Sequence, residues 1–338
     1  MTDQELLNIT KKYSKEIPLL SWWALLSTLA LILNAIFLIA HTTNYLALAI
    51  LSVILGLFLV RLFTIYHDFN HHSILTKSTA AKIFMYIFGL VCLCPESLWS
   101  FYHDYHHKNN SKFSQIVFGS FPIITCEQFA TLNGFEKKKY LMARHPVTII
   151  FSYLTIFLIS FCIRPFIKNP LKHWAGALSV LLHFSFIIII SLFSSKMLLF
   201  AFVIPIFIMC FTAGYFFYVQ HNFPGIKLYG EKQWNYINAS LFSSSYIKMN
   251  TVWQWISANI GYHHIHHLNS KIPFYNLPKV MNENREFNNV ISTTLKVKDI
   301  IECLKLKLWD CQNERMVTLK YFKENYTNTD KKIKHDQQ

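Results

Sequence analysis

Charged residues are scarce in this chain. Asp, Glu, Lys and Arg make up 15% of its 338 residues, whereas 53% of the residues are hydrophobic. A water-soluble domain carries roughly a quarter charged residues. The missing charge is localised, because apolar stretches of about 20 residues recur, and this is the length that a helix needs to cross the bilayer core. The composition excludes an ordinary soluble domain and predicts a polytopic, α-helical membrane protein.

Other absences narrow the class further. The seven cysteines include no CxxC pair, so we expect them to be reduced packing residues. The apolar stretches hold almost no ionisable side chains, which argues against an ion pathway through the membrane. No nucleic-acid-binding motif is present. We expect the net charge of +14 to lie on loops against anionic lipid headgroups, and a docking face for an acidic redox partner is the alternative.

The apolar stretches predict two transmembrane hairpins. Lysine and arginine flank the hairpins and are nearly absent from the short links within them, which places both chain ends in the cytoplasm. Two shorter apolar stretches, 83–98 and 147–163, are then expected to be re-entrant or interfacial. We expect a cytoplasmic N-terminal segment, 1–19, a membrane domain, 20–277, and a cytoplasmic tail, 278–338. The four predicted spans are Leu20–Ala40, Tyr45–Ile65, Trp174–Phe193 and Met197–Tyr218.

Histidine, in contrast, is abundant, with 16 residues. The stretches "HDFNHH", "HDYHH" and "HHIHH" and the "QHN" after the fourth span all fall on the predicted cytoplasmic side, close to helix ends. Five other histidines have simpler explanations. We expect three at the membrane edge (His41, His145, His173), one hydrogen-bonded in the core (His183) and one solvated in the tail (His335). The clustered histidines are His67, His71, His72, His103, His106, His107, His221, His263, His264, His266 and His267.

The spacing of these histidines predicts metal binding. Residues at i, i+3 and i+4 share a helix face. Two of the stretches have this spacing, one with histidines at 103, 106 and 107 and the other with histidines at 263, 266 and 267. Neutral imidazole suits iron, copper or zinc. Nine nitrogens are too many for one ion but fit two ions with four or five ligands each. The clusters contain no cysteine and no Glu-x-x-His pair, unlike structural zinc and carboxylate-bridged di-iron sites. An all-nitrogen dinuclear site at a membrane surface indicates oxygen activation directed at a lipid-soluble substrate.

The four histidine stretches together, "HDFNHHS", "HDYHH", "QHN" and "HHIHHLNSKIPFYNL", resemble those of the membrane fatty-acid desaturase family, most closely acyl-lipid desaturases of the Δ12/ω-6 kind. The resemblance runs from the second span to Leu277 and covers about two-thirds of the chain. It implies a non-haem di-iron centre on the cytoplasmic side. O₂ and two electrons would then introduce a cis double bond into a fatty acyl chain. The implied ligands are His67, His71, His103, His106, His107, His221, His263, His266 and His267.

The resemblance also implies partners. The chain has no His-Pro-Gly-Gly haem motif, so we expect a separate electron donor, such as a ferredoxin, a flavodoxin or a small cytochrome. Two aspartates, Asp68 and Asp104, each follow the first histidine of a box and are candidates to fix a ligand ring from outside. His72 and His264 are candidates for the same role or for spare ligands. A di-iron hydroxylase or carotenoid ketolase is the nearest alternative function, and a metal-binding or metal-transporting membrane protein is the alternative of another class.

Overall fold

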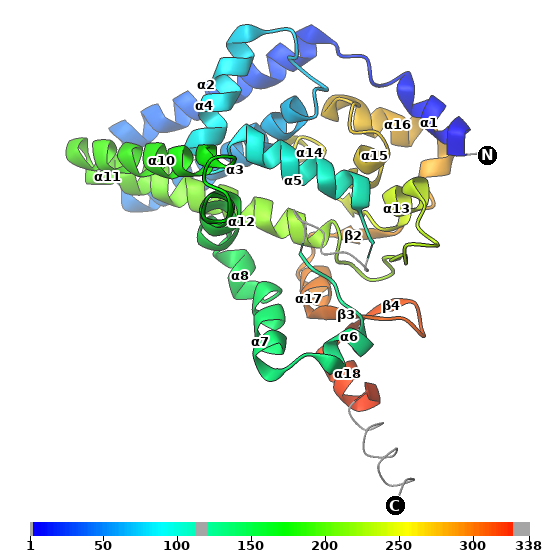
Figure 1. Ribbon diagram of the computed structural model, residues 1–338. Helices are drawn as coiled ribbons and strands as arrows, with labels where there is room; N and C mark the ends of the chain where they lie inside the picture. The colour runs from blue at the N-terminus through cyan, green and yellow to red at the C-terminus, as the bar shows by residue number, and fades with distance from the viewer. Residues whose placement is uncertain (1–2, 113–120, 327–338) are drawn as a thin grey trace, which may run out of the picture.

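Figure 1 shows the computed structural model, which describes residues 3–112 and 121–326. The fold is all-α apart from two small sheets, and long helices extend to one side of a compact group of short helices. Four of the helices are long and apolar enough to cross a membrane. They confirm the four predicted spans to within a few residues. They are α2 (Pro18–His41), α3 (Tyr45–Asn70), α10 (Trp174–Phe193) and the continuous segment Ser195–Val219, which comprises α11 (Ser195–Met197), η2 (Leu198–Val203) and α12 (Ile204–Val219).

The long helices pack through small and hydroxylated residues and expose apolar side chains outward. Ser52 of α3 donates a hydrogen bond to the Phe200 carbonyl at 2.6 Å. One turn later, Gly56 lies so close to Ile208 that a Cβ at residue 56 would collide with that side chain. The outer faces present residues such as Leu33, which is 66% exposed, and Leu192, which is 79% exposed. Such faces require lipid, so the protein is a membrane protein.

The two shorter apolar stretches are interrupted helices. The first comprises α4 (Thr79–Val91) and α5 (Glu96–Asn109), which meet at an angle of 87°, the geometry of a broken span or a re-entrant loop. The second comprises α8 (Pro146–Ile150), the π-helix η1 (Tyr153–Ile163) and α9 (Arg164–Lys168). The break after α4 directs α5 toward the ends of α3 and α12 (Figure 1).

Short elements cover the ends of α3 and α12 and form a cap (Figure 1). Tyr13 and Tyr275 join the N-terminal segment to this cap, through hydrogen bonds to Glu283 and to the Ile17 backbone. The cap consists of α1 (Asp3–Lys11), α13 (Tyr236–Phe242), α14 (Thr251–Ile256), α15 (His263–Leu268), η3 (Phe274–Asn276), α16 (Leu277–Glu283), η4 (Arg285–Phe287) and the parallel strands β1 (Tyr246–Lys248) and β2 (Ser292–Thr294).

The C-terminal region packs beside the end of α12. Asn222 donates to the Cys303 carbonyl at 2.6 Å, and Tyr218 donates to the Leu306 carbonyl at 3.1 Å. The strands here were not predicted. All seven cysteines are free and six of them are buried, as expected. The elements are α17 (Val297–Lys305), the antiparallel strands β3 (Leu306–Asp310) and β4 (Arg315–Thr318), and α18 (Leu319–Tyr326), which packs with α6 (Cys126–Thr131) and α7 (Gly134–Ala143).

Candidate metal centre

Four segments that are far apart in the sequence bring nine histidines together at the ends of the long helices. The last turn of α3 and the residue after it supply His67 and His71, and His221 follows the end of α12. Helices α5 and α15 each supply three more, at the spacing i, i+3 and i+4 that places them on one face. The nine are those predicted from the sequence, and they form two clusters.

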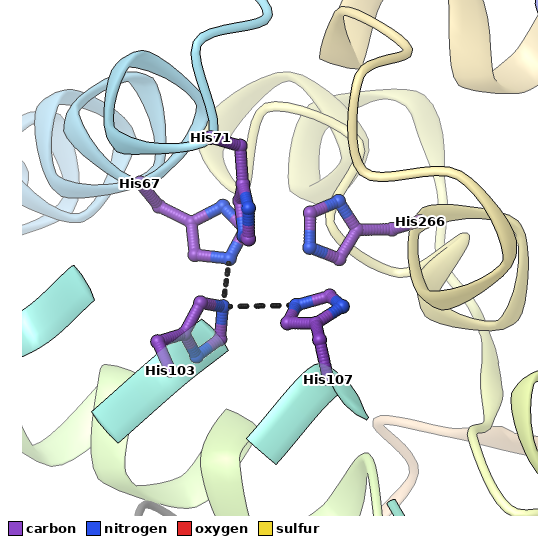
Figure 2. Close-up of side chains that lie close together, drawn as sticks. All are labelled: His67, His71, His103, His107 and His266. Carbon is purple, nitrogen blue, oxygen red and sulfur yellow. Dashed lines mark hydrogen bonds between the residues drawn. The ribbon is translucent and has the colours of Figure 1, made fainter. Parts of the chain in front are cut away.

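The first cluster contains five buried histidines, whose candidate ligand nitrogens all lie within 4.8 Å of one another. Figure 2 shows their rings pointing toward a common centre from α3, α5 and α15. The Nε2 atom of His103 lies 2.9 Å from His67 Nε2 and 3.1 Å from His107 Nε2. The members are His67, His71, His103, His107 and His266.

The second cluster has four members, His106, His221, His263 and His267, which again meet through Nε2. His221 Nε2 lies 2.9 Å from His106 Nε2 and 3.0 Å from His263 Nε2. His263 Nε2 lies 3.0 Å from His267 Nε2. Both α5 and α15 contribute to both clusters, and the two clusters are neighbours: the rings of His107 and His267, one from each, lie 4.1 Å apart.

The geometry fits metal ions. With metal–nitrogen bonds near 2.1 Å, neighbouring ligands of an octahedral ion lie roughly 3.0 Å apart, which matches the Nε2 separations of both clusters. His71 Nε2 and both ring nitrogens of His266 are buried, yet they have no hydrogen-bond partner among the described residues. Buried polar atoms in native proteins almost always have partners. An ion at the centre of the first cluster would supply them.

Burial holds three histidines of the second cluster in the form that binds metal. Burial lowers the pKa of His221 to about 4, although its hydrogen bond with the Ser243 carbonyl opposes the shift. Burial, and then neighbouring histidines, lower the pKa of His263 and His267 well below the usual value. These imidazoles are therefore neutral at physiological pH, and each keeps a lone pair for an ion.

Two contacts from outside the clusters orient ligand rings. Asp68 is fully buried; its Oδ1 lies 3.3 Å from His67 Nδ1, and its Oδ2 accepts the Phe274 N–H at 2.7 Å. On the second cluster, His221 Nδ1 donates to the Ser243 carbonyl at 3.1 Å. A proton held on Nδ1 leaves Nε2 free to coordinate. Asp68 was predicted for this role, whereas no sequence signal indicated the Ser243 carbonyl.

Comparison with known proteins decides the family. The model of the family described as "Fatty acid desaturase" matches residues 43–289, a range that includes all nine histidines. The chain belongs to the fatty acid desaturase family. A curated relative with the same name, from Bacillus subtilis (strain 168), is 27% identical over 96% of this chain and 94% of its own length. Membership of this family implies an oxidoreductase.

The remaining candidate residues of this desaturase-family chain lie apart from the clusters. Asp104 is exposed on α5, and His72, with φ of 55°, turns outward after the end of α3. His264 is fully buried but belongs to neither cluster, and its ring lies 5.7 Å from that of Tyr246. His41 and His145 are exposed, His173 is half-buried, and His183 is hydrogen-bonded in the core; His335 lies outside the described residues.

An apolar pocket leads to both clusters. It lies between α3 and α12, and most of its wall is hydrocarbon or aromatic. His67 and His103 of the first cluster and His106, His221 and His263 of the second also face it. The apolar part of this wall suits an apolar ligand better than a polar metabolite. The other residues that line it are Val60, Phe63, Thr64, Trp99, Ala213, Phe216, Phe217, Gln220 and Ile260.

Proposed function

We propose that the protein is a membrane acyl desaturase that holds two non-haem irons and uses O₂ and two electrons to introduce a cis double bond into a fatty acyl chain. The single observation that carries the proposal is the apolar pocket, because its wall contains imidazoles of both histidine clusters. Family membership and the resemblance of the histidine boxes support the same reading.

Each cluster would hold one ion. The five histidines of the first cluster and the four of the second offer only neutral nitrogen ligands, and Asp68 and the Ser243 carbonyl orient two of the rings. When bound, the irons would supply the oxidising chemistry that removes hydrogen from unactivated carbon. Neighbouring aromatic rings, Phe63, Trp99 and Phe217, contact one another and would exclude water and hold the acyl chain beside the ligands.

The proposed orientation places the cap, both chain ends and the histidine clusters in the cytoplasm, following the lysines and arginines that flank the spans. The substrate chain would enter the pocket between α3 and α12 from the bilayer. Electrons would come from a separate small protein, a ferredoxin, a flavodoxin or a small cytochrome.

Fatty-acid profiling tests the proposal. The gene is expressed in a host without polyunsaturated lipids, and lipids are analysed by gas chromatography and mass spectrometry. A new diene supports a Δ12-type activity, and a new monoene supports an earlier desaturation. His106→Ala should abolish the product, whereas His72→Ala, an exposed histidine beside the first box, should retain it. Hydroxylated or ketolated products without a new alkene would show that the protein is a hydroxylase or a ketolase and not a desaturase. No lipid product, with labile zinc or copper in the protein, would favour metal binding or transport.

A further inference from the structure

The break between α4 and α5 leaves backbone carbonyls without their usual helical partners. In an α-helix, the carbonyl of residue i accepts a hydrogen bond from the N–H of residue i+4. For Val91, at the end of α4, that residue is Pro95, which has no N–H. Leu93, within the break, has φ of 58°, in the left-handed region that residues with a side chain rarely adopt. The 87° turn is therefore a conformation that surrounding residues must hold in place.

Side chains from three other helices donate hydrogen bonds to carbonyls at the break; the Leu90 carbonyl also accepts a long backbone bond, from the Leu93 N–H at 3.4 Å. The donors come from α3, η1 and α10, which surround the break. Each bonds a different carbonyl, in an apolar region where an unpaired carbonyl is costly. The bonds, donor first, are Ser179 Oγ to Leu90 at 2.5 Å, His183 Nδ1 to Val91 at 2.6 Å, Cys162 Sγ to Leu93 at 3.3 Å, and the Tyr66 hydroxyl to Cys94 at 2.7 Å.

His183 is fixed in one tautomer by this arrangement. A carbonyl can only accept, so His183 Nδ1 carries the proton that bonds Val91. Its Nε2 then accepts from the Tyr153 hydroxyl at 2.9 Å. Both ring nitrogens are thus used, and the side chain is fully buried. His183 lies in α10, 92 residues along the chain from Val91, so it ties α10 to the break.

The direction of α5 depends on this break. Helix α5 supplies His103 and His107 to the first cluster and His106 to the second. From Glu96 to His107 the helix axis advances roughly 17 Å, so a change of about 5° at the break moves the far end by roughly 1.5 Å. Metal sites tolerate a displacement of only about 0.5 Å.

We propose that Ser179 and His183 are positioning residues for the metal centre: by bonding the carbonyls at the end of α4, they hold the break at its angle and direct the three histidines of α5 into the two clusters. The metal part of this inference rests on the proposed function. The control of the direction of α5 does not, because it follows from hydrogen bonds of the protein alone.

The experiment compares purified full-length variants in detergent. Ser179→Ala combined with His183→Phe removes both donors. The single variant His183→Asn keeps Ser179 and has an amide N–H near the position of Nδ1, so it should retain a bond to the Val91 carbonyl. Ser191→Ala is the matched control, because Ser191 lies on the same helix and bonds only the Ile188 carbonyl of that helix. The readouts are iron content per chain and hydrogen exchange of the amides of α5.

In the double variant we expect exchange in α5 to be roughly tenfold faster, as the loss of one or two buried hydrogen bonds predicts. Iron should fall from about two per chain to about one or fewer, as misplaced ligands predict. His183→Asn and Ser191→Ala should each leave both readouts at the wild-type level. If the double variant does not fold, Ser179→Ala alone is measured in the same way.

Unchanged exchange in α5 and unchanged iron content in a folded variant would overturn the proposal. Equal effects of Ser191→Ala would also overturn it, because the effect would then not depend on the break. If the wild-type protein binds no iron, the proposed function fails, and hydrogen exchange in α5 still decides whether these residues hold the break.

Discussion

Replacing Asp68 by Asn should disturb the first cluster by changing the tautomer of one ligand. The buried carboxylate has one oxygen 3.3 Å from His67 Nδ1 and the other on the Phe274 N–H. An amide has one acceptor oxygen only. If that oxygen keeps the bond to Phe274, the NH₂ group faces His67 Nδ1 and favours the tautomer with its proton on Nε2. Nε2 is the nitrogen that lies 2.9 Å from His103 Nε2 in the cluster. Once it carries the proton, it has no lone pair with which to bind the metal.

The expected loss can be estimated. Outer partners of metal-bound histidines contribute about 10–100-fold to metal affinity, and each tenfold corresponds to about 1.4 kcal/mol. Asp68→Asn should therefore weaken iron binding at one of the two sites by about 1.4–2.8 kcal/mol. A chelator competition series on the purified protein measures this loss, with a thermal unfolding scan to establish that the variant is folded.

Asp104→Asn is the matched control. It is the same substitution directly after the first histidine of the second box, but Asp104 is exposed, so iron affinity should not change. Wild-type iron affinity in folded Asp68→Asn would contradict this role of Asp68, because the carboxylate would then not determine the tautomer of His67. An equal loss in both variants would refute it as well, since the effect would then be one of charge alone.

Three further predictions concern the clusters and the pocket. His266→Ala removes a ligand of the first cluster and should lower the iron content by about one ion per chain. His264 is also buried but belongs to neither cluster, so His264→Ala should keep the iron. Equal iron contents in the two variants would contradict the assignment of His266 as a ligand. Ala213→Phe fills the apolar pocket and should lower product formation about tenfold or more at unchanged iron content; wild-type product would mean that the acyl chain binds elsewhere. Chelating the iron should lower Tm, since bound ligand at 100 times its Kd stabilises the folded state by about 2.7 kcal/mol; an unchanged Tm would show that the buried imidazoles need no ion.

Much of the candidate centre could be predicted from spacing. Imidazoles at i, i+3 and i+4 must share a helix face, and the topology put all four segments at one end of the spans. The division into two clusters could not be predicted in this way. His106 and His107 are neighbours in the sequence, yet they join different clusters because successive residues of α5 diverge by about 100° around the axis. Which cluster each ring faces depends on how α5 and α15 are docked.

The roles of the extra histidines also depended on tertiary structure. His72 turns outward because α3 ends two residues earlier and the backbone takes a positive φ there, and the sequence does not fix that end to one residue. The flanking lysines and arginines indicated that 83–98 is re-entrant or interfacial, but they did not indicate what stabilises its break. The donors that stabilise it come from Ser179 and His183 of α10, at a distance in sequence where local patterns carry no information.

The most direct test of the proposed dinuclear centre is anomalous X-ray diffraction at the iron absorption edge, on crystals of the purified protein. Two iron peaks are expected in each molecule, one in each histidine cluster. A folded protein with its anomalous signal at the zinc or copper edge, or with iron outside the clusters, would contradict it. The expected neighbours are His67, His71, His103, His107 and His266 around one peak, and His106, His221, His263 and His267 around the other.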